Sequence, residues 1–531
     1  MKKGQLLIVL NAHLPFVRHP EFPSFLEENW LFEAISETYL PLLRTFHNLE
    51  NKGIPFRMSL SFSPTLISML TDSFLQDRYL KHLDLQLELG AKELERTKTQ
   101  LEFHKLATLY TALYKQNKED FSELYQGNLL KGFTYFMKKG HLEILSSAAT
   151  HPLLPLYQDY PENIEAQIQT AVETHYRAFN RTPKGFWLPE CAYYPGLDEL
   201  LKKYKLEYFF TSAHGVLFSR DFPKNGVFAP LRTPQGLHAF ARDLSSTNNI
   251  WSPEEGYPGD PVYRDFYRDI GFDLPMDYIG PYLQGGENRV NTGFKYYAVS
   301  GKTEKKSCYD PEKAKKKIEE HAENFIYNRL KQIEKLGSLM DGKKPLIVAP
   351  FDAELFGHFW YEGTAWLEVF WEKMSRTPEL EAVTAGDYLL DSPVNQENEL
   401  SFSTWATGGY AEVWLDGKND WIIRHTHKCI QRMQELVDRF PNESGRKERA
   451  LNQAAREVLL CQSSDWPLMI KMGTTVEYAQ RRVKEHVNNF SRIYDSLSSN
   501  TLETEWLTKL ERKNNLFPDL DYRVFKRHQP T

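Results

Sequence analysis

Short runs of apolar residues alternate with longer amphipathic stretches through the first 400 residues of the chain. Seven of these runs have the length and the β-branched or aromatic content of buried strands. They are residues 6–10, 56–62, 142–145, 185–188, 208–211, 346–349 and 380–384. Helical patterns lie between most of them, such as the one that opens with the capping residue Asp310 and Pro311. This alternation predicts a parallel sheet.

Polar and ionisable residues come directly after the predicted strands. They are Asn11, His13, Ser63, His151, Glu190, His214, Asp352 and Asp387. In a β/α barrel such positions share one rim, where barrel enzymes place their sites, whereas a doubly wound sheet gathers them only near its switch point. We therefore predict an α/β fold, a distorted barrel of about seven strands, with residues 1–400 as the catalytic domain.

Two segments interrupt the alternation of strands and helices. Residues 77–139 have the pattern of charged helices, and we expect a helical insertion there. Residues 221–296 are rich in Gly, Pro and Tyr and are too long for a simple connection, which predicts a loop that shapes a site. After residue 400 the strand pattern stops, so residues 401–531 are predicted to form a helical C-terminal domain.

Composition narrows the range of functions. Lys and Arg number 65 against 71 Asp and Glu, so the formal charge is −6 and no basic excess is available for nucleic acid. The apolar runs are far shorter than a membrane span, and Met1-Lys2-Lys3 leads into a strand, so we expect a cytoplasmic protein. The four cysteines are widely separated and are expected to be reduced. Aromatic residues reach 14%, which suits stacking against sugar rings or a broad interface.

Two motifs place an acid after an apolar strand and beside aromatic residues. In the first, Glu190 follows Pro189, and in the second, Asp352 follows the strand at residues 346–349. Two carboxylates on one rim are the usual minimum for cleaving a glycosidic bond. Either acid alone could equally be a helix cap or a salt-bridge partner. Glu354 is an alternative to Asp352, but it lies one step further from the strand end.

Histidines and tryptophans provide further candidate site residues. Four histidines near predicted strand ends could bind a divalent metal or donate to sugar hydroxyls, although neither HxH nor HExxH spacing favours a metal there. They are His13, His151, His214 and His358. The candidate sugar platforms, each with core packing as the alternative, are Trp30, Trp251, Trp405 and Trp414.

Five motifs occur along the chain in an order that we recognise. They are Asn11-Ala12-His13-Leu14-Pro15-Phe16, Trp187-Leu188-Pro189-Glu190-Cys191, the tract around His214, Phe351-Asp352-Ala353-Glu354-Leu355-Phe356-Gly357-His358, and Thr384-Ala385-Gly386-Asp387. Supporting tracts are Gly256-Tyr257-Pro258-Gly259-Asp260, Trp405 with Trp414, and Gln462-Ser463-Ser464-Asp465-Trp466. Over nearly its whole length the chain resembles glycoside hydrolase family 57, within it the group of α-1,4-glucan branching enzymes and α-amylase-like proteins.

The resemblance implies a (β/α)7 barrel, a small helical insertion and a helical C-terminal domain that closes over a glucan cleft. It implies a retaining mechanism with Glu190 as nucleophile and Asp352 as general acid/base, without metal or organic cofactor. The implied subsite residues are His13, Trp30, His151, His214, Trp360, Trp405 and Trp414. As further substrate-binding residues we expect Trp251, His358 and Asp465.

The chain departs from the resemblance at three places, none of which touches the carboxylate pair. Asn11 stands where similar members carry histidine, and Ser212 stands where many carry aspartate. Residues 232–246 contain no tyrosine, whereas branching members are described as having one on a mobile loop over the cleft.

We predict a glucan branching enzyme, which transfers a cleaved α-1,4-glucan chain to a 6-hydroxyl. Transfer to water would make it an α-amylase, and transfer to a 4-hydroxyl a 4-α-glucanotransferase. A metal-dependent deacetylase-like hydrolase using the rim histidines with Asp352 or Asp387 is a remote alternative. A non-catalytic glucan-binding protein is disfavoured by the carboxylate pair.

Overall fold

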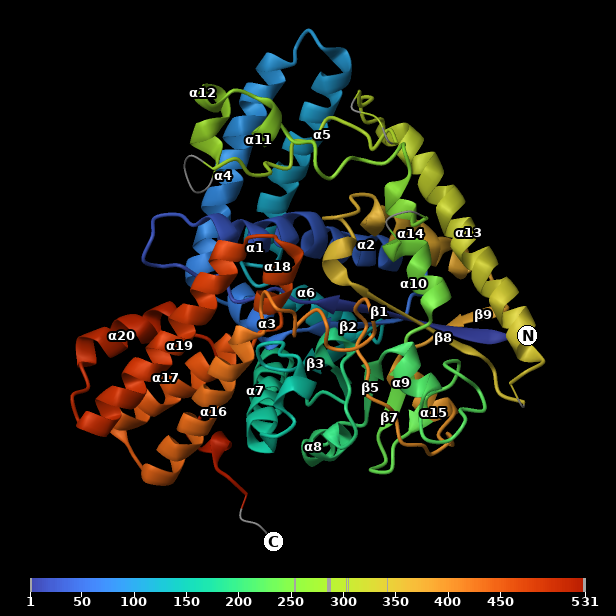
Figure 1. The fold of residues 1–531 in the computed structure, drawn as a ribbon. Coiled ribbons are helices and arrows are strands. Elements are labelled where there is room, and N and C mark those ends of the chain that lie inside the picture. Colours follow the sequence, from blue (N-terminus) through green and yellow to red (C-terminus); the bar gives the residue numbers. More distant parts are fainter. Residues whose placement is uncertain are drawn as a thin grey trace.

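A curled sheet forms the centre of the molecule, and helices cover its outside (Figure 1). The structure is a computed structural model that describes residues 2–252, 255–283, 288–301, 303, 305–340 and 342–528. The strands of these residues are β1 (Gly4–Ala12), β2 (Met58–Phe62), β3 (Leu142–Ser147), β4 (Gly185–Trp187), β5 (Tyr208–Thr211), β6 (Leu231–Arg232), β7 (His238–Ala241), β8 (Leu346–Asp352) and β9 (Leu380–Ala382).

Parallel pairing joins the strands in the order β7-β5-β4-β3-β2-β1-β8, and β6 is antiparallel to β7 at one edge. In the described part of the chain no ladder joins β7 to β8. The gap is bridged instead where the backbone N–H of Asp243 donates to the carbonyl of Val348 at 2.8 Å. The predicted α/β fold with a distorted barrel of seven parallel strands is confirmed.

The barrel strand β7 lies within residues 221–296, a segment that the sequence predicted to be a loop. This segment also contains β6 and the helix α10 (Leu244–Trp251), so the prediction of a loop was wrong within residues 231–251. The run at 380–384 does form a strand, β9, but it pairs only with the start of β1, beside the barrel path. β7 was not predicted because its four residues, His-Ala-Phe-Ala, have a low strand propensity.

Both faces of β1 are buried, which explains its continuous apolar sequence. Leu7 and Val9 point into the barrel, where they pack in one cluster with Trp187 of β4. Leu6 and Ile8 belong to the larger cluster between the sheet and the surrounding helices. The packed interior fixes the strand ends, and therefore fixes the rim residues that follow them.

Helices cover the outside of the barrel. They are α1 (Asn29–Ala34), α2 (Leu40–Asn51), α3 (Pro64–Leu70), α7 (Pro161–Phe179), α8 (Leu197–Lys203), α9 (Ala213–Leu217), α13 (Pro311–Gly337), α14 (Gly363–Met374) and α15 (Ala385–Asp391). A π-helical turn (Ile35–Tyr39) joins α1 to α2. The helix α13 begins as its sequence indicates, because the Asp310 side chain accepts from the N–H of Glu312 at 3.0 Å and Pro311 occupies the first turn.

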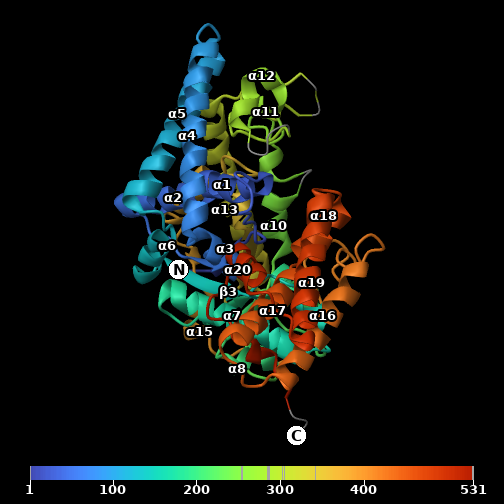
Figure 2. The same cartoon turned by 90° about the vertical axis from the view of Figure 1, so that its left-hand side faces the viewer.

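A helical hairpin projects from the barrel between β2 and β3. It consists of α4 (Ser73–Arg96) and α5 (Leu101–Glu119), and α6 (Leu130–Lys138) then leads the chain back to β3. The hairpin rises above the body of the molecule in both views (Figures 1 and 2). Asp72 caps α4 by accepting a hydrogen bond from Leu75 N at 3.0 Å.

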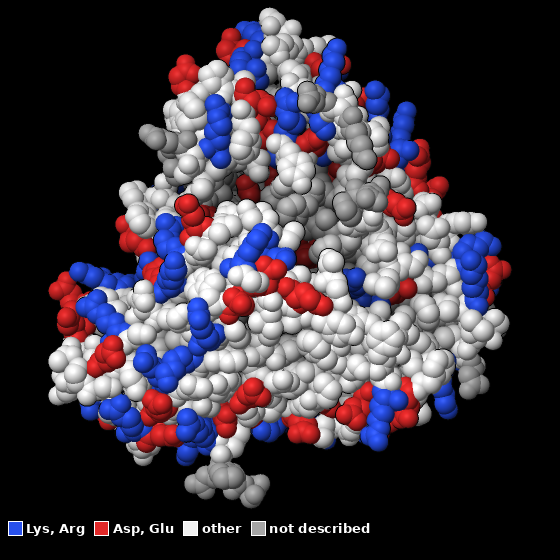
Figure 3. All heavy atoms as spheres, in the orientation of Figure 1, with Lys and Arg blue, Asp and Glu red and all other residues white. Residues whose placement is uncertain are grey.

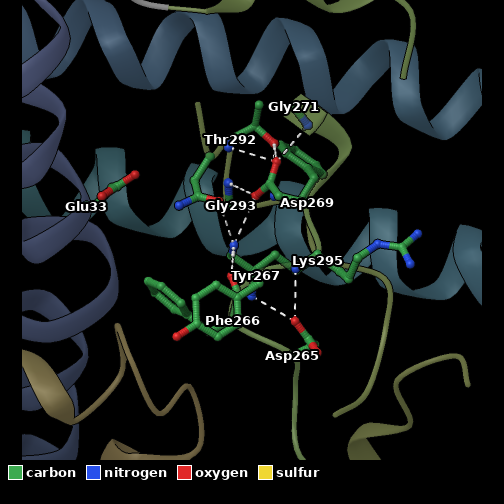
Figure 4. A network of polar contacts seen from close by, with 12 residues as sticks. Glu33, Asp265, Phe266, Tyr267, Asp269, Gly271, Thr292, Gly293 and Lys295 are labelled. Carbon is green, nitrogen blue, oxygen red and sulfur yellow. Dashed lines mark hydrogen bonds and ion pairs between the residues drawn. The ribbon is translucent and has the colours of Figure 1, made fainter. Parts of the chain in front are cut away.

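The segment after α10 lies against the hairpin and contains α11 (Ile270–Asp273) and α12 (Met276–Ile279). Glu93 of α4 accepts hydrogen bonds from the hydroxyls of Tyr278 and Tyr296, at 2.8 and 2.7 Å. The segment is also folded on itself, because the Asp269 carboxylate accepts from backbone N–H groups on both sides of the loop (Figure 4). The Lys295 ammonium, 2% exposed, lies 3.4 Å from this carboxylate.

The C-terminal part is helical and packs beside α7 (Figure 2). Its helices are α16 (Trp421–Arg439), α17 (Gly445–Cys461), α18 (Asp465–Met472), α19 (Val476–Ser499) and α20 (Thr504–Lys513). The surface is hollowed between the upper hairpin region and the body of the molecule, and acidic atoms lie inside the hollow (Figure 3).

Candidate active site

Glu190 follows β4 in a strained backbone conformation. The strand ends at Trp187, and the next residues form a single short turn around Pro189. Glu190 and Cys191 both have positive φ, 61° and 51°, although neither is glycine. Such conformations persist only where the surroundings hold them, and they are concentrated at functional sites. The turn directs the side chain of Glu190, a residue that is only 8% exposed, toward the carboxyl end of the barrel.

Two donors from the C-terminal part hold the Glu190 carboxylate. The indole Nε1 of Trp405 donates to Oε2 and the hydroxyl of Ser464 donates to Oε1, both at 2.8 Å. Burial raises the pKa of Glu190, and these two hydrogen bonds oppose that rise. The backbone is fixed as well, since the N–H of Trp405 donates to the Glu190 carbonyl at 2.9 Å.

Asp352 ends β8 and lies opposite Asn11 in the register with β1. The Asn11 amide lies 3.4 Å from Oδ1 of Asp352. Burial raises the pKa of Asp352 to about 8, and the nearby charges of Glu354 and Glu190 add to the rise. At neutral pH, Asp352 therefore holds a proton that it can donate.

Glu354 is a third carboxyl at this rim, buried next to Asp352. It accepts hydrogen bonds from the Tyr39 hydroxyl and, at 3.2 Å, from the backbone N–H of His13. Burial raises its pKa to about 7, although these contacts act in the opposite direction. The position of Tyr39 in the π-helical turn is what brings its hydroxyl to this carboxyl.

Two of the predicted histidines stack on one another beside the carboxyls. The rings of His13 and His151 are 3.8 Å apart between centroids and 11° from parallel. His13 contacts the Ser63 hydroxyl through Nδ1 at 2.8 Å and Asp465 through Nε2 at 3.0 Å. Burial acts to lower the pKa of His13, but Asp465 outweighs it and the pKa is raised. His151 lies 3.8 Å from Glu190, measured from Nδ1 to Oε1.

The other predicted aromatic and histidine residues lie at varied positions around this centre. Trp251, 42% exposed, meets Trp405 edge to face, with centroids 5.5 Å apart. His214 contacts the carbonyl of Gly409 at 2.5 Å, and Trp30 contacts Tyr478 edge to face at 5.6 Å. In the chain, Trp30 follows β1, His214 follows β5 and Trp251 follows β7, and each contacts a residue of the C-terminal part.

His358 pairs with acidic residues of α1 and of the π-helical turn that follows it. Its Nδ1 lies 2.6 Å from Glu37, and Nε2 lies 3.9 Å from Glu33. Burial acts to lower the pKa of His358, but Glu37 outweighs it and the pKa is raised. The His358 ring also meets Phe266 of the long segment edge to face at 5.2 Å.

Three predictions do not fit these positions. Trp360 is 1% exposed and packs on Trp366, while Trp414 is 2% exposed in a cluster with Leu153. Rings buried to this extent offer no face to a sugar, so we assign both to packing. Asp387 was expected on the same rim as Glu190, but it pairs with Arg57, which directly precedes β2, at the opposite end of the barrel.

Ser464, Tyr39 and Glu37 contact predicted site residues but were not among them. Ser464 adjoins Asp465 in a motif, which was a usable signal. The contacts of Tyr39 and Glu37 depend on how their helix turns, and no sequence motif marks these two residues. Across the residues that the structure describes, no three or more His, Cys, Asp or Glu side chains are grouped to hold a metal ion. None of the described helices has the length and apolar character to cross a membrane.

Comparison with known proteins identifies the family. The model of glycosyl hydrolase family 57 matches residues 7–401, which is most of the chain. The chain belongs to this family. A second model, the C-terminal region of 1,4-alpha-glucan branching enzymes, matches residues 425–525. The protein is therefore an enzyme of a glucan-acting family.

Three relatives extend over nearly the whole chain. The 1,4-alpha-glucan branching enzyme of Thermococcus kodakarensis is 30% identical over 97% of this chain and 77% of its own length. The structure of the alpha-amylase AmyC of Thermotoga maritima is 42% identical, with a TM-score of 0.93 and full coverage of both chains. The family 57 branching enzyme of Pyrococcus horikoshii is 31% identical, with a TM-score of 0.88, over 100% of this chain and 98% of that one.

Proposed function

We propose that the protein is a retaining 1,4-alpha-glucan branching enzyme, with Glu190 as nucleophile and Asp352 as general acid/base. The observation that carries the proposal is the pair of carboxyls on one rim, the buried Glu190 and the partly buried Asp352, in unlike environments. Such pairs divide the roles of acid and nucleophile. The match of residues 425–525 to the branching-enzyme C-terminal region supports branching as the outcome.

In the first step, Asp352 would supply a proton to the departing sugar. With a pKa of about 8, its carboxyl is protonated at neutral pH. One oxygen of Glu190 attacks the anomeric carbon while the C1–O4 bond breaks, and the Asp352 proton goes to O4. A glucosyl ester on Glu190 results, and Asp352 becomes a carboxylate.

In the second step, the same carboxylate accepts the proton of an acceptor hydroxyl. The acceptor's O6 attacks C1, the ester bond breaks, and Glu190 is released as a carboxylate with an α-1,6 branch formed. The donors Trp405 and Ser464 stabilise that carboxylate as the leaving group.

The subsites would be built around the carboxyls from both parts of the chain. The residues that we propose to contact glucan are His13, Trp30, His151, His214, Trp251, His358, Trp405 and Asp465. We propose residues 1–400 as the catalytic part and 401–531 as a part that completes the cleft, because Trp405 and Ser464 both reach Glu190. The cytoplasmic location stays a prediction.

Hydrolysis is the second candidate outcome, and one observation favours it. The AmyC alpha-amylase is 42% identical to this chain, more than either branching enzyme above. Both outcomes share the same covalent intermediate and differ only in whether water or a sugar hydroxyl resolves it. Branching requires that water be kept from the ester while an acceptor chain is held close.

Debranching analysis separates the two outcomes. After incubation with amylose, the product is treated with isoamylase and the released chains are resolved by length. New short chains that appear only after isoamylase treatment are expected for branching. Short chains that are already present before that treatment, and do not increase with it, would indicate an alpha-amylase.

A further inference from the structure

Two exposed aromatic side chains share one aromatic neighbour near the catalytic rim. Phe359, in the loop after β8, is 54% exposed, and Tyr267, in the segment before α11, is 81% exposed. Both contact the ring of Phe266, with centroids 5.0 and 5.2 Å apart. Single exposed apolar residues need no explanation, whereas a contiguous exposed group marks a binding surface. We call Phe266, Tyr267 and Phe359 the aromatic platform.

The aromatic platform is joined to the loop that carries the general acid. The backbone N–H of Phe359 donates to the carbonyl of Glu354 at 3.2 Å, so the loop after Asp352 folds back on itself. The His358 ring lies between the two parts of the platform, 4.7 Å from Phe359 and 5.2 Å from Phe266 between centroids. The platform therefore continues the rim on the side of the general acid.

The backbone and the rear of the platform are held in place. The buried Lys295 ammonium lies 5.2 Å from the centre of the Phe266 ring and donates to the Phe266 carbonyl at 2.5 Å. The backbone N–H groups of Tyr267 and Arg268 donate to the Asp265 carboxylate at 2.7 and 2.9 Å (Figure 4). The rings are therefore positioned before a ligand arrives, which lowers the entropy cost of binding.

A carboxyl beside the platform has no hydrogen-bond partner among the described residues. The Glu33 side chain is 19% exposed, and its Oε2 lies 3.9 Å from Nε2 of His358. Burial raises the pKa of Glu33 to about 7, so at neutral pH the carboxyl is only partly ionised. Trp30, already a proposed subsite residue, lies one turn earlier on the same helix, so both side chains share one face. Glu33 can therefore take up hydrogen bonds with a ligand in the cleft.

Flat apolar rings next to a hydrogen-bonding carboxyl fit a sugar. A glucose unit has C–H groups on its two faces and hydroxyls around its edge. Its faces can lie on Phe359 and Tyr267, while Glu33 binds hydroxyls at the edge. An anionic ligand fits poorly, because acidic atoms lie inside the hollow of this surface (Figure 3) and would repel it. The ligand class is therefore a neutral sugar chain.

We propose that the aromatic platform binds the glucan chain on the leaving-group side of the scissile bond, and afterwards the acceptor chain that replaces it. The proton of Asp352 goes to O4, the first atom of the departing chain, and the platform continues from the loop of Asp352. The inference rests on the proposed function, from which it takes the roles of Glu190 and Asp352. An acceptor held there competes with water for the glucosyl ester.

Substitutions of exposed rings test the platform without opening the core. Tyr267→Ala and Phe359→Ala each remove one exposed ring. Tyr267→Phe keeps the ring and removes the hydroxyl, so it separates stacking from hydrogen bonding. Tyr327→Ala is the matched control, because Tyr327 is 59% exposed on α13 and is not part of the platform.

The experiment measures the binding of maltoheptaose by calorimetry in the Glu190→Gln protein, which cannot turn the sugar over. Tyr267→Ala and Phe359→Ala should each weaken binding at least about fivefold, because a stacked ring is lost. Tyr267→Phe and Tyr327→Ala should change it less than about twofold. Crystals soaked in maltoheptaose should show sugar on Phe359, on the reducing-end side of the bond that lies between residues 190 and 352.

Unchanged affinity in both alanine variants would overturn the inference, and so would sugar that reaches the platform from the non-reducing side. Neither result would affect the proposed function, which is tested by the branches that the wild-type enzyme forms. Conversely, a wild-type enzyme that forms no branches would contradict the proposed function, while weakened binding in the alanine variants would still support the platform as the leaving-group site.

Discussion

The indole N–H of Trp405 donates a hydrogen bond to Oε2 of Glu190 across 2.8 Å, although 215 residues separate the two in the chain. Ser464 donates to the other oxygen of the same carboxylate. One buried acid of the barrel is thus held from both sides by residues that come after the last strand. Loss of these two hydrogen bonds would raise the pKa of Glu190 further, because they oppose the effect of burial.

Replacing the indole donor should shift the pH dependence of catalysis. Trp405→Phe removes a hydrogen bond to a charged group, worth about 1.5–3 kcal/mol, and keeps most of the ring. Burial then raises the pKa of Glu190 with less opposition, so the acidic limb of kcat/KM moves to higher pH. We expect activity at neutral pH to fall about 10- to 100-fold.

Trp251→Phe is the control, since Trp251 touches the Trp405 ring and, among the described residues, makes no hydrogen bond to Glu190. It should leave the acidic limb in place. An unmoved limb in Trp405→Phe would show that the hydrogen bond does not set the ionisation of Glu190.

Glu190→Gln should abolish turnover and leave the fold intact. An amide cannot form the glucosyl ester, and loss of a member of a catalytic unit costs at least about 10³-fold in kcat. The amide oxygen can accept from the Trp405 indole, and the Ser464 hydroxyl can rotate to accept from the amide NH2, so thermal unfolding should change little. Substantial remaining activity in a correctly folded variant would remove Glu190 from the mechanism.

Asp352→Asn should slow the departure of a sugar far more than that of an activated aryl group. Only the sugar needs a proton in the transition state. The wild-type enzyme should also lose activity as pH rises above about 8, because Asp352 then gives up the proton it donates. The Asp352→Asn variant should not show this loss of activity at high pH when it acts on the aryl substrate. Equal losses on both substrates would point to Glu354, and Glu354→Gln would then be measured in the same way.

The two tryptophans of the domain junction should behave differently. Trp414 is 2% exposed, so Trp414→Ala leaves a cavity and should lower the free energy of unfolding by about 3–5 kcal/mol. Trp405→Ala should mainly impair catalysis on glucan, because this ring holds Glu190 and meets the exposed Trp251. Chemical denaturation and glucan kinetics on both variants distinguish the cases. Normal stability together with weakened glucan use in Trp414→Ala would restore it as a sugar platform.

The local sequence predicted the strand ends well, because both faces of barrel strands are apolar and the next polar residue marks the rim. Asp352 and Asn11 could be placed in this way, and they face each other across β8 and β1. β7 could not, because a strand of four residues in a Gly- and Pro-rich segment has no distinctive period.

The burial of side chains outside the strands could not be predicted. Trp405 and Trp414 lie nine residues apart in the same stretch after the last strand motif, yet one meets Glu190 and the other packs against Leu153. The Ser464 contact joins positions 274 apart, which no local pattern encodes. Tertiary packing determines both the burial of these tryptophans and the contact of Ser464 with Glu190.

The balance between branching and hydrolysis tests the central claim most directly. Proton NMR of amylose, recorded during incubation with the wild-type enzyme, measures α-1,6 linkages and reducing ends in the same sample. Water is present at about 55 M, so transfer prevails only if the ester on Glu190 is shielded and an acceptor is held close. We predict that α-1,6 linkages rise several-fold more than reducing ends. Reducing ends that rise as fast as the branch points, or faster, would contradict the account and make the enzyme an α-amylase.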